Sequence, residues 1–148
     1  MRCNYSTELG SVKTWVQLSN AKRLLVTSAR EAADRSTSRY RLGAALSTSD
    51  RGVTLTGCNT LKTHPLQRRY TQRIAPEKIT LHAEIAVLAK LRGVSHIRPR
   101  TMAIARVLPS TGELAGSRPC DQCLVAMMEF GVRDVLFYED NNWSLASI

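Results

Sequence analysis

Two short groups of residues carry side chains that can bind a metal or move a proton. The first is His82-Ala83-Glu84, and the second is the run from Pro119 to Cys123, which reads P-C-D-Q-C. The other cysteines, Cys3 and Cys58, stand alone. A C-x-x-C pair in a chain without a secretory signal favours metal or redox chemistry over a structural disulfide. Because Pro119 precedes the pair rather than dividing it, we favour metal binding.

These donors suit a catalytic zinc site. Each group begins a predicted helix, and a helix N-terminus lowers the pKa of a nearby thiol. His82, Cys120 and Cys123 supply three ligands for tetrahedral Zn²⁺ and leave the fourth position open. Zinc lowers the pKa of a bound water to about 7, and Glu84, which is not needed as a ligand, can carry the proton. Positions two apart on a helix diverge by about 200°, so His82 must lie in the first turn.

Three helices and five strands are expected to position these groups. Only 140–142 separates the last two strands, and a parallel pair needs a connection of a dozen or more residues, so these strands should be antiparallel. The segment 59–78 has no sustained periodicity and is predicted to be a loop. The remaining apolar patterns predict a helix over 12–33, a hairpin of strands 41–47 and 53–58 turning at Asp50-Arg51-Gly52, a helix over 81–92, a strand over 102–108, a helix from 119 or 120 to 130, and strands over 135–138 and 143–148.

The motif pair and the order of elements together resemble the zinc-dependent cytidine deaminase superfamily, whose signature is H-x-E followed by P-C-x-x-C. The resemblance extends from about residue 12 to the C-terminus. It implies an α/β fold, a three-layer α/β/α sandwich around a mixed five-stranded sheet. It also implies that His82, Cys120 and Cys123 bind zinc while Glu84 shuttles protons, and that water replaces an amino group, which leaves as ammonia. A homo-oligomer is expected by resemblance alone.

The same resemblance suggests substrate contacts. Asn59, which follows Gly57-Cys58, and Ala83 are predicted to touch the substrate, although an asparagine there is also a good turn residue. The stretch that begins Lys62-Thr63-His64-Pro65 and continues to Tyr70 resembles one in small phage and bacterial deaminase-like proteins, and we expect it to rim the pocket. Lys62, Arg68 or Arg69 could hold a phosphate, His64 could hydrogen-bond the substrate, and Tyr70 could stack on a base. Alternatively, these are ordinary loop residues.

The branch of the superfamily stays open. The first motif begins with histidine rather than cysteine, and in this it resembles the deoxycytidylate, transfer-RNA adenosine, guanine and polynucleotide deaminases. The antiparallel final strands look more like the free-nucleoside cytidine deaminases. Formal net charge is +9, and residues 61–100 alone carry nine basic side chains against Glu77 and Glu84, a balance of +7. Such a patch suits a phosphate-bearing partner, but Tyr70 is its one aromatic residue, whereas base-stacking platforms need several.

We therefore expect the substrate to be a cytosine base in a free nucleoside or nucleotide. The rivals are a deaminase of cytosine or adenine in single-stranded DNA or RNA, and a zinc-stabilised module that binds nucleic acid without chemistry. The 148 residues, 43% of them hydrophobic, predict one globular domain rather than a disordered tail. The resemblance implies that residues 1–148 form a single deaminase domain. With no apolar run of eighteen residues and no secretory signal, the sequence predicts no membrane partner and a cytoplasmic location.

Overall fold

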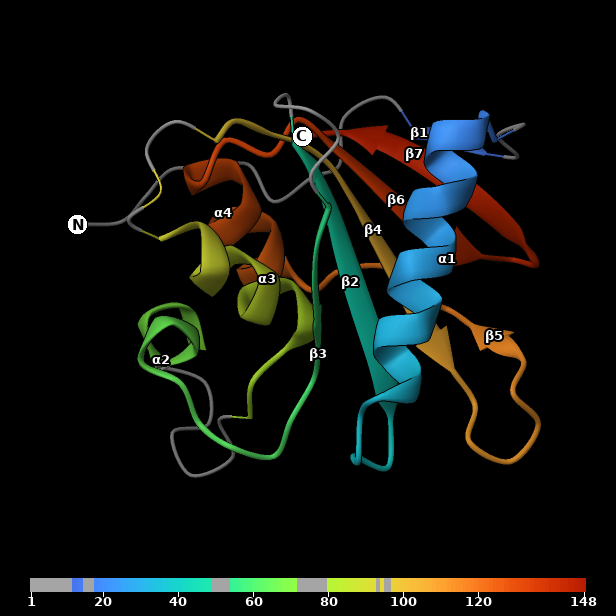
Figure 1. Ribbon diagram of the computed structural model, residues 1–148, viewed down its shortest axis with the longest axis horizontal. Coiled ribbons are helices and arrows are strands. Elements are labelled where there is room, and N and C mark those ends of the chain that lie inside the picture. Colours follow the sequence, from blue (N-terminus) through green and yellow to red (C-terminus); the bar gives the residue numbers. More distant parts are fainter. Residues whose placement is uncertain (1–11, 15–17, 49–53, 72–79, 93, 95–96) are drawn as a thin grey trace.

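A computed structural model describes residues 12–14, 18–48, 54–71, 80–92, 94 and 97–148 (Figure 1). Its centre is a mixed sheet of seven strands in the order β1-β7-β6-β4-β2-β3, with β5 paired to β4. Strands β4 and β6 are parallel, and the other described pairs are antiparallel. The strands are β1 (Val12–Thr14), β2 (Arg41–Thr48), β3 (Thr54–Cys58), β4 (Pro99–Val107), β5 (Leu114–Ala115), β6 (Asp134–Glu139) and β7 (Asn142–Ser147).

The three-layer sandwich predicted from the sequence is confirmed. Helix α1 covers one face of the sheet, and the other three described helices cover the opposite face (Figure 1). All five expected strands are present, and the short strands β1 and β5 extend the sheet beyond them. Within the described residues, every helix is too short or too polar to cross a membrane. The helices are α1 (Asn20–Asp34), α2 (Pro65–Thr71), α3 (Ala83–Leu91) and α4 (Asp121–Glu129).

Helix α1 packs very closely on the sheet because its inner face is built from small residues. Ala29, Ala32 and Ala33 are fully buried and lie at helical spacing against β2. Gly43 of β2 completes the contact, since a Cβ atom there would come within 2.0 Å of the Ala29 carbonyl oxygen. This position therefore excludes any larger side chain, and the close contact fixes one outer layer of the sandwich.

The opposite face holds the larger core and sets the positions of the two motif-bearing helices. Ile85 and Leu88 of α3 and Met127 of α4 are fully buried in one cluster with Met102 and Ile104 of β4. This packing holds α3 and α4 against the same face and against each other. Consequently His82 and Cys120, which immediately precede these helices, come together although 38 positions separate them in the sequence.

The hairpin formed by β6 and β7 confirms the predicted antiparallel end of the chain. Glu139 pairs with Asn142, which leaves Asp140 and Asn141 as a two-residue loop with φ of 52° and 62°. Two successive left-handed residues are what a type I′ turn requires, and Asp and Asn tolerate this conformation better than most residues. The short connection therefore reverses the chain, as its length predicts.

The prediction of a helix over 12–33 was wrong at its beginning. Val12–Thr14 is strand β1, which pairs with β7, and helix α1 begins only at Asn20. Ser19 sets this boundary, because its hydroxyl accepts a hydrogen bond from the Lys22 backbone N–H at 3.3 Å and so caps the helix. Trp15 and Val16, which supported the longer helix, lie outside the described residues.

The prediction that 59–78 is a loop was also wrong in part, because it contains helix α2. Pro65 occupies the first helical position, where its missing N–H costs nothing. The His64 ring accepts a hydrogen bond from the Leu66 backbone N–H at 3.1 Å. Burial of Leu66 and Gln67 then stabilises a helix too short to persist alone. Residues 72–78 of the predicted loop lie outside the described residues, and so does the predicted hairpin turn at 50–52.

Candidate active site

Three metal-binding side chains converge where α3 and α4 begin. The Nδ1 atom of His82 lies 3.7 Å from the sulfur of Cys120 and 3.4 Å from that of Cys123. All three donor atoms lie within 4.8 Å of one another. Tetrahedral zinc with ordinary bond lengths separates a nitrogen and a sulfur ligand by about 3.5 Å. The donors therefore match a zinc site in both type and spacing.

The sequence analysis required His82 to stand at the beginning of its helix, where a side chain need not follow the helical rotation, and the structure places it there. His82 precedes the first turn of α3 with extended backbone angles, φ −79° and ψ 152°. Because His82 is not itself helical, its ring need not point about 200° away from Glu84, as it would two positions away on a regular helix. Cys120 precedes α4 with almost the same geometry, φ −73° and ψ 163°. Each helix thus presents its N-terminal end, with its unpaired backbone N–H groups, to the donor cluster.

Electrostatics favour a thiolate in this cluster even before a metal binds. The pKa of Cys120 is lowered to about 4, because the Cys123 thiol donates a hydrogen bond to it and His82 lies beside it. The same hydrogen bond, together with burial, raises the pKa of Cys123. Hydrogen bonding to Cys120 raises the pKa of His82. Cys120 therefore offers a ready anionic ligand, and metal binding would displace the Cys123 proton.

Glu84 places a buried carboxyl group beside these donors. It lies in the first turn of α3 and is only 4% exposed. Burial raises the pKa of this carboxyl group, and the negative charge of Cys120 raises it further. A buried carboxyl group with a raised pKa is the kind of group that enzymes use as a general acid and base. Glu84 is therefore suited to proton transfer.

Gln67 supports His82 from behind. Its side chain is fully buried on α2, and its Oε1 atom accepts a hydrogen bond from the His82 backbone N–H at 2.9 Å. This N–H belongs to the residue that caps α3, so the bond fixes the direction in which the chain enters the helix. The amide nitrogen of Gln67 has no hydrogen-bond partner among the described residues. Gln67 was missed from the sequence because the segment was predicted to be a loop.

A pocket of about 550 Å³ opens beside the donor cluster. Among its lining residues are five of those that the sequence analysis selected, namely Asn59, His82, Ala83, Glu84 and Cys120. Cys123 belongs to the donor cluster but is fully buried. The remaining lining residues are Tyr40, Leu42, Thr80, Leu81, Arg106, Gly116, Ser117 and Arg118.

The Asn59 amide is largely engaged in holding the pocket wall. Its Oδ1 accepts hydrogen bonds from the Ser36 hydroxyl at 2.7 Å and from the Leu42 backbone N–H at 2.9 Å. Its Nδ2 donates to the Tyr40 carbonyl oxygen at 2.6 Å. A primary amide has two N–H groups, so one hydrogen remains for a ligand. Asn59 therefore joins β3 to the segment before β2, and its contact with substrate stays a prediction.

The structure does not bring Lys62, His64 or Tyr70 to this pocket. Lys62 is exposed, and the His64 ring caps α2. The Tyr70 hydroxyl donates to the carboxylate of Glu129 on α4. Arg68 and Arg69 are exposed on α2 and are likewise absent from the pocket lining. That any of these residues contacts substrate stays a prediction.

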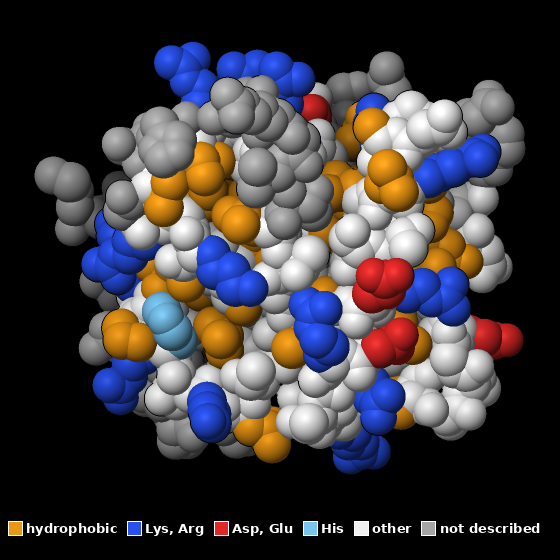
Figure 2. Space-filling view, viewed as in Figure 1, with side chains coloured by type: hydrophobic (Ala, Val, Ile, Leu, Met, Phe, Trp, Pro, Cys, Tyr) orange, Lys and Arg blue, Asp and Glu red, His pale blue; other side chains and the backbone are white. Residues whose placement is uncertain are grey.

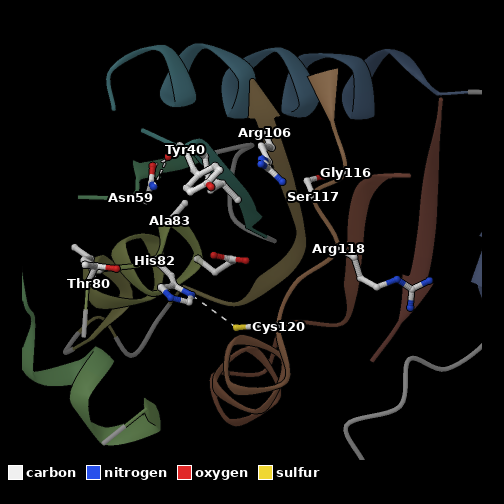
Figure 3. Close-up of a pocket in the computed structure, with 13 residues that line it drawn as sticks. Tyr40, Asn59, Thr80, His82, Ala83, Arg106, Gly116, Ser117, Arg118 and Cys120 are labelled. Atoms are coloured by element: carbon white, nitrogen blue, oxygen red, sulfur yellow. Dashed lines mark hydrogen bonds between the residues drawn. The ribbon is translucent and has the colours of Figure 1, made fainter. Parts of the chain in front are cut away.

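Two arginines that the sequence analysis did not select line the pocket instead, and they differ in their surroundings. Arg118 forms a two-point salt bridge with Glu139, at 3.0 and 2.9 Å, which raises the pKa of Arg118 and lowers that of Glu139. Its side chain points away from His82 and Cys120 (Figure 3). Arg106 of β4 lies with its guanidinium carbon 5.0 Å from the centre of the Tyr40 ring, inside the pocket.

A family model decides what this site belongs to. The cytidine and deoxycytidylate deaminase zinc-binding region matches residues 18–139, which include all three donors and Glu84. The chain belongs to this family. It is accordingly a zinc-dependent hydrolytic deaminase, with His82 and the two cysteines positioned as its possible zinc site.

Solved structures of cytidine deaminases share the fold of this deaminase. The enzyme from Mycobacterium tuberculosis is 25% identical, with a TM-score of 0.57 over 82% of this chain and 87% of that one. The enzyme from Burkholderia pseudomallei is 20% identical, with a TM-score of 0.63 over 88% and 93% of the two chains. The curated proteins compared with this deaminase include no significant match.

Replacing Gln67 with methionine is expected to weaken zinc binding by the deaminase about tenfold, in the range found when supporting partners of metal ligands are removed. Methionine fills similar space but cannot accept the hydrogen bond that holds the His82 backbone. Competition with a chromogenic chelator measures the affinity. Thr71→Val is the matched control, since among the described residues its hydroxyl donates a hydrogen bond to the Gln67 carbonyl oxygen within α2 and to no other group. Unchanged zinc affinity in Gln67→Met would show that Gln67 only fills the core.

Proposed function

We propose that this deaminase converts a cytosine base to uracil in a free nucleoside or nucleotide, with residues 1–148 forming one domain. The observation that carries the proposal is the buried carboxyl group of Glu84, set beside three metal donors of which two, His82 and Cys120, line the same pocket. A purely structural metal site has no use for a proton carrier next to an open ligand position. This combination supports hydrolysis over metal-stabilised binding.

His82, Cys120 and Cys123 would hold Zn²⁺, whose Lewis acidity makes water a nucleophile at neutral pH. Glu84 accepts one proton from the attacking water and delivers it to the ring nitrogen, and it then accepts the proton of the new hydroxyl group and delivers it to the amino group, which leaves as ammonia. Water enters, ammonia leaves and uracil remains, so atoms and charge balance. The raised pKa of Glu84 suits both directions of transfer. Leu42 and Ala83 give the base an apolar wall within the pocket.

The size of the pocket supports a small substrate. Its volume of about 550 Å³ lies within the range of roughly 300–1,000 Å³ typical of sites for small molecules. Among the described residues that line the pocket, Tyr40 is the one Phe, Tyr or Trp. A channel for single-stranded nucleic acid combines a continuous cationic groove with several stacking platforms. The lining therefore supports a free nucleoside or nucleotide.

The basic side chains supply only weak support for a nucleic-acid substrate. The described members of the 61–100 patch are all exposed, and none lines the pocket. On the face drawn in Figure 2, Lys and Arg side chains are dispersed and do not form one stripe. Arg73 and Lys78 lie outside the described residues. The homo-oligomer and the cytoplasmic location stay predictions.

A substrate panel tests the proposal. The zinc-loaded deaminase is incubated with cytidine, deoxycytidine, their monophosphates, and single-stranded DNA and RNA that contain cytosine, and ammonia release is measured. We expect turnover of at least one free nucleoside or nucleotide. Turnover of the polymers alone would overturn the choice of substrate. Zinc binding without deamination of any member would instead favour the non-catalytic module.

A further inference from the structure

Arg106 is a charged residue on an inward-facing row of strand β4. Side chains alternate between the faces of a strand. Ala103 and Ala105 pack under α1, whereas Met102 and Ile104 are fully buried in the core beneath α3 and α4. By this alternation Arg106 follows Met102 and Ile104 on the face that carries the donor cluster. Its partner in register is Leu42 of β2, which also lines the pocket.

A guanidinium group in this position needs compensation. Removing a charge from water is costly unless an opposite charge or a set of acceptors replaces the solvent. Among the described residues, no carboxylate forms a salt bridge with Arg106. Arg118 illustrates the alternative, because Glu139 neutralises it at the edge of the same pocket. Arg106 is half-buried and keeps its positive charge available within the site.

Tyr40 holds this charge in place without neutralising it. The guanidinium carbon of Arg106 lies 5.0 Å from the centre of the Tyr40 ring, a cation–π contact. A stacked arginine keeps its N–H donors at the edge of the plane, where they can form paired hydrogen bonds with an oxyanion. Figure 3 shows Tyr40 and Arg106 together on one side of the pocket, with His82 and Cys120 on the other side. The arrangement is that of a preformed anion-binding group.

We propose that Arg106 binds the phosphate group of a cytosine nucleoside monophosphate and thereby makes the monophosphate the preferred substrate. The proposal rests on the proposed function, since it names the substrate form that the same site accepts. It assigns to Arg106 the role that the sequence suggested for Lys62, Arg68 or Arg69, none of which lines the pocket. Tyr40 acts as a positioning residue for the guanidinium group.

A single phosphate fits the arrangement better than a polymer does. Of the two arginines in the lining, only Arg106 lacks a salt bridge among the described residues. One guanidinium group can pair with one phosphate through two hydrogen bonds. Polynucleotide binding would call for a succession of such groups leading away from the pocket. The proposal therefore commits to a free monophosphate.

The test compares wild type with Arg106→Gln, using cytidine, deoxycytidine, their monophosphates and a single-stranded oligonucleotide. We expect the wild type to prefer a monophosphate over its nucleoside in kcat/KM. Loss of a charge-assisted hydrogen bond should raise KM for that monophosphate by about 10- to 100-fold. The kcat/KM for the nucleoside should change less than about threefold, because the base contacts remain. Arg106→Lys, which keeps the charge, should recover part of the loss.

Arg100→Gln is the matched control, because it removes the same charge from an exposed position on the same strand that does not line the pocket. It should leave the preference unchanged. Calorimetry with uridine or deoxyuridine monophosphate gives a readout without turnover, and Arg106→Gln should weaken product binding by the same factor. An unchanged preference in Arg106→Gln, or a wild type that prefers nucleosides or the oligonucleotide, would overturn the role of Arg106. Deamination of none of these substrates would instead reject the proposed function.

Discussion

Replacing Glu84 with glutamine should lower kcat by about 10²- to 10⁴-fold, the range that general acid–base catalysis supplies. The amide keeps the size of the carboxyl group and its place in the first turn of α3, but it cannot accept and release a proton. Zinc should remain at about one ion per chain, because Glu84 is not needed to complete the donor set. Steady-state ammonia release measures the first effect, and metal analysis of the purified variant measures the second.

Glu129→Gln is the matched control for this variant. Glu129 is a half-buried helical glutamate whose carboxylate accepts a hydrogen bond from Tyr70, and it does not line the pocket. Its replacement should leave kcat within about threefold of wild type, as expected for a change remote from the reacting atoms. A Glu84→Gln variant that keeps full activity would remove Glu84 from the mechanism. Loss of zinc from that variant would instead indicate that the Glu84 carboxylate is a zinc ligand.

The metal site could be predicted because its information is local. His82 and Cys120 each precede a helix, and the apolar faces of α3 and α4 dictate that both helices pack on one side of the sheet. Residue type, helix entry and burial all point to the same arrangement, and such agreement between levels is what makes a sequence interpretable. The resemblance to a known superfamily then supplied the order of the layers.

The support and the rim of the site could not be predicted because their information is not local. Gln67 lies on a seven-residue helix that depends on tertiary burial for its stability, so no periodicity marks it. Arg106 stands near the end of strand β4, where a charged residue usually marks the point at which a strand leaves the core. Strand alternation places Arg106 on the same face as Met102 and Ile104, but only the structure shows that a pocket lies over that end of the face, where Arg106 pairs in register with Leu42.

Replacing Cys120 with serine should remove both zinc and activity. The pKa of Cys120 is lowered to about 4, so this cysteine is already a thiolate at neutral pH, before any metal binds. A serine hydroxyl keeps its proton at neutral pH and gives zinc a much poorer donor than a thiolate. With one ligand lost from three, metal content should fall well below one zinc per chain, and ammonia release should fall by at least about 10³-fold.

Stability separates loss of the metal from loss of the fold. A ligand that binds only the folded chain stabilises it by about 2.7 kcal/mol when present at a hundred times its Kd. Zinc should therefore raise the Tm of the wild type, and a chelator should lower it, while the Tm of Cys120→Ser should respond to neither. Cys58→Ser is the matched control, because Cys58 is also a half-buried free cysteine but lies outside the pocket. It should keep zinc, activity and the zinc-dependent rise in Tm. If Cys120→Ser retained one zinc per chain and the same zinc-dependent rise in Tm, Cys120 would not be a ligand. The proposed set of three zinc ligands with one open position would then be wrong.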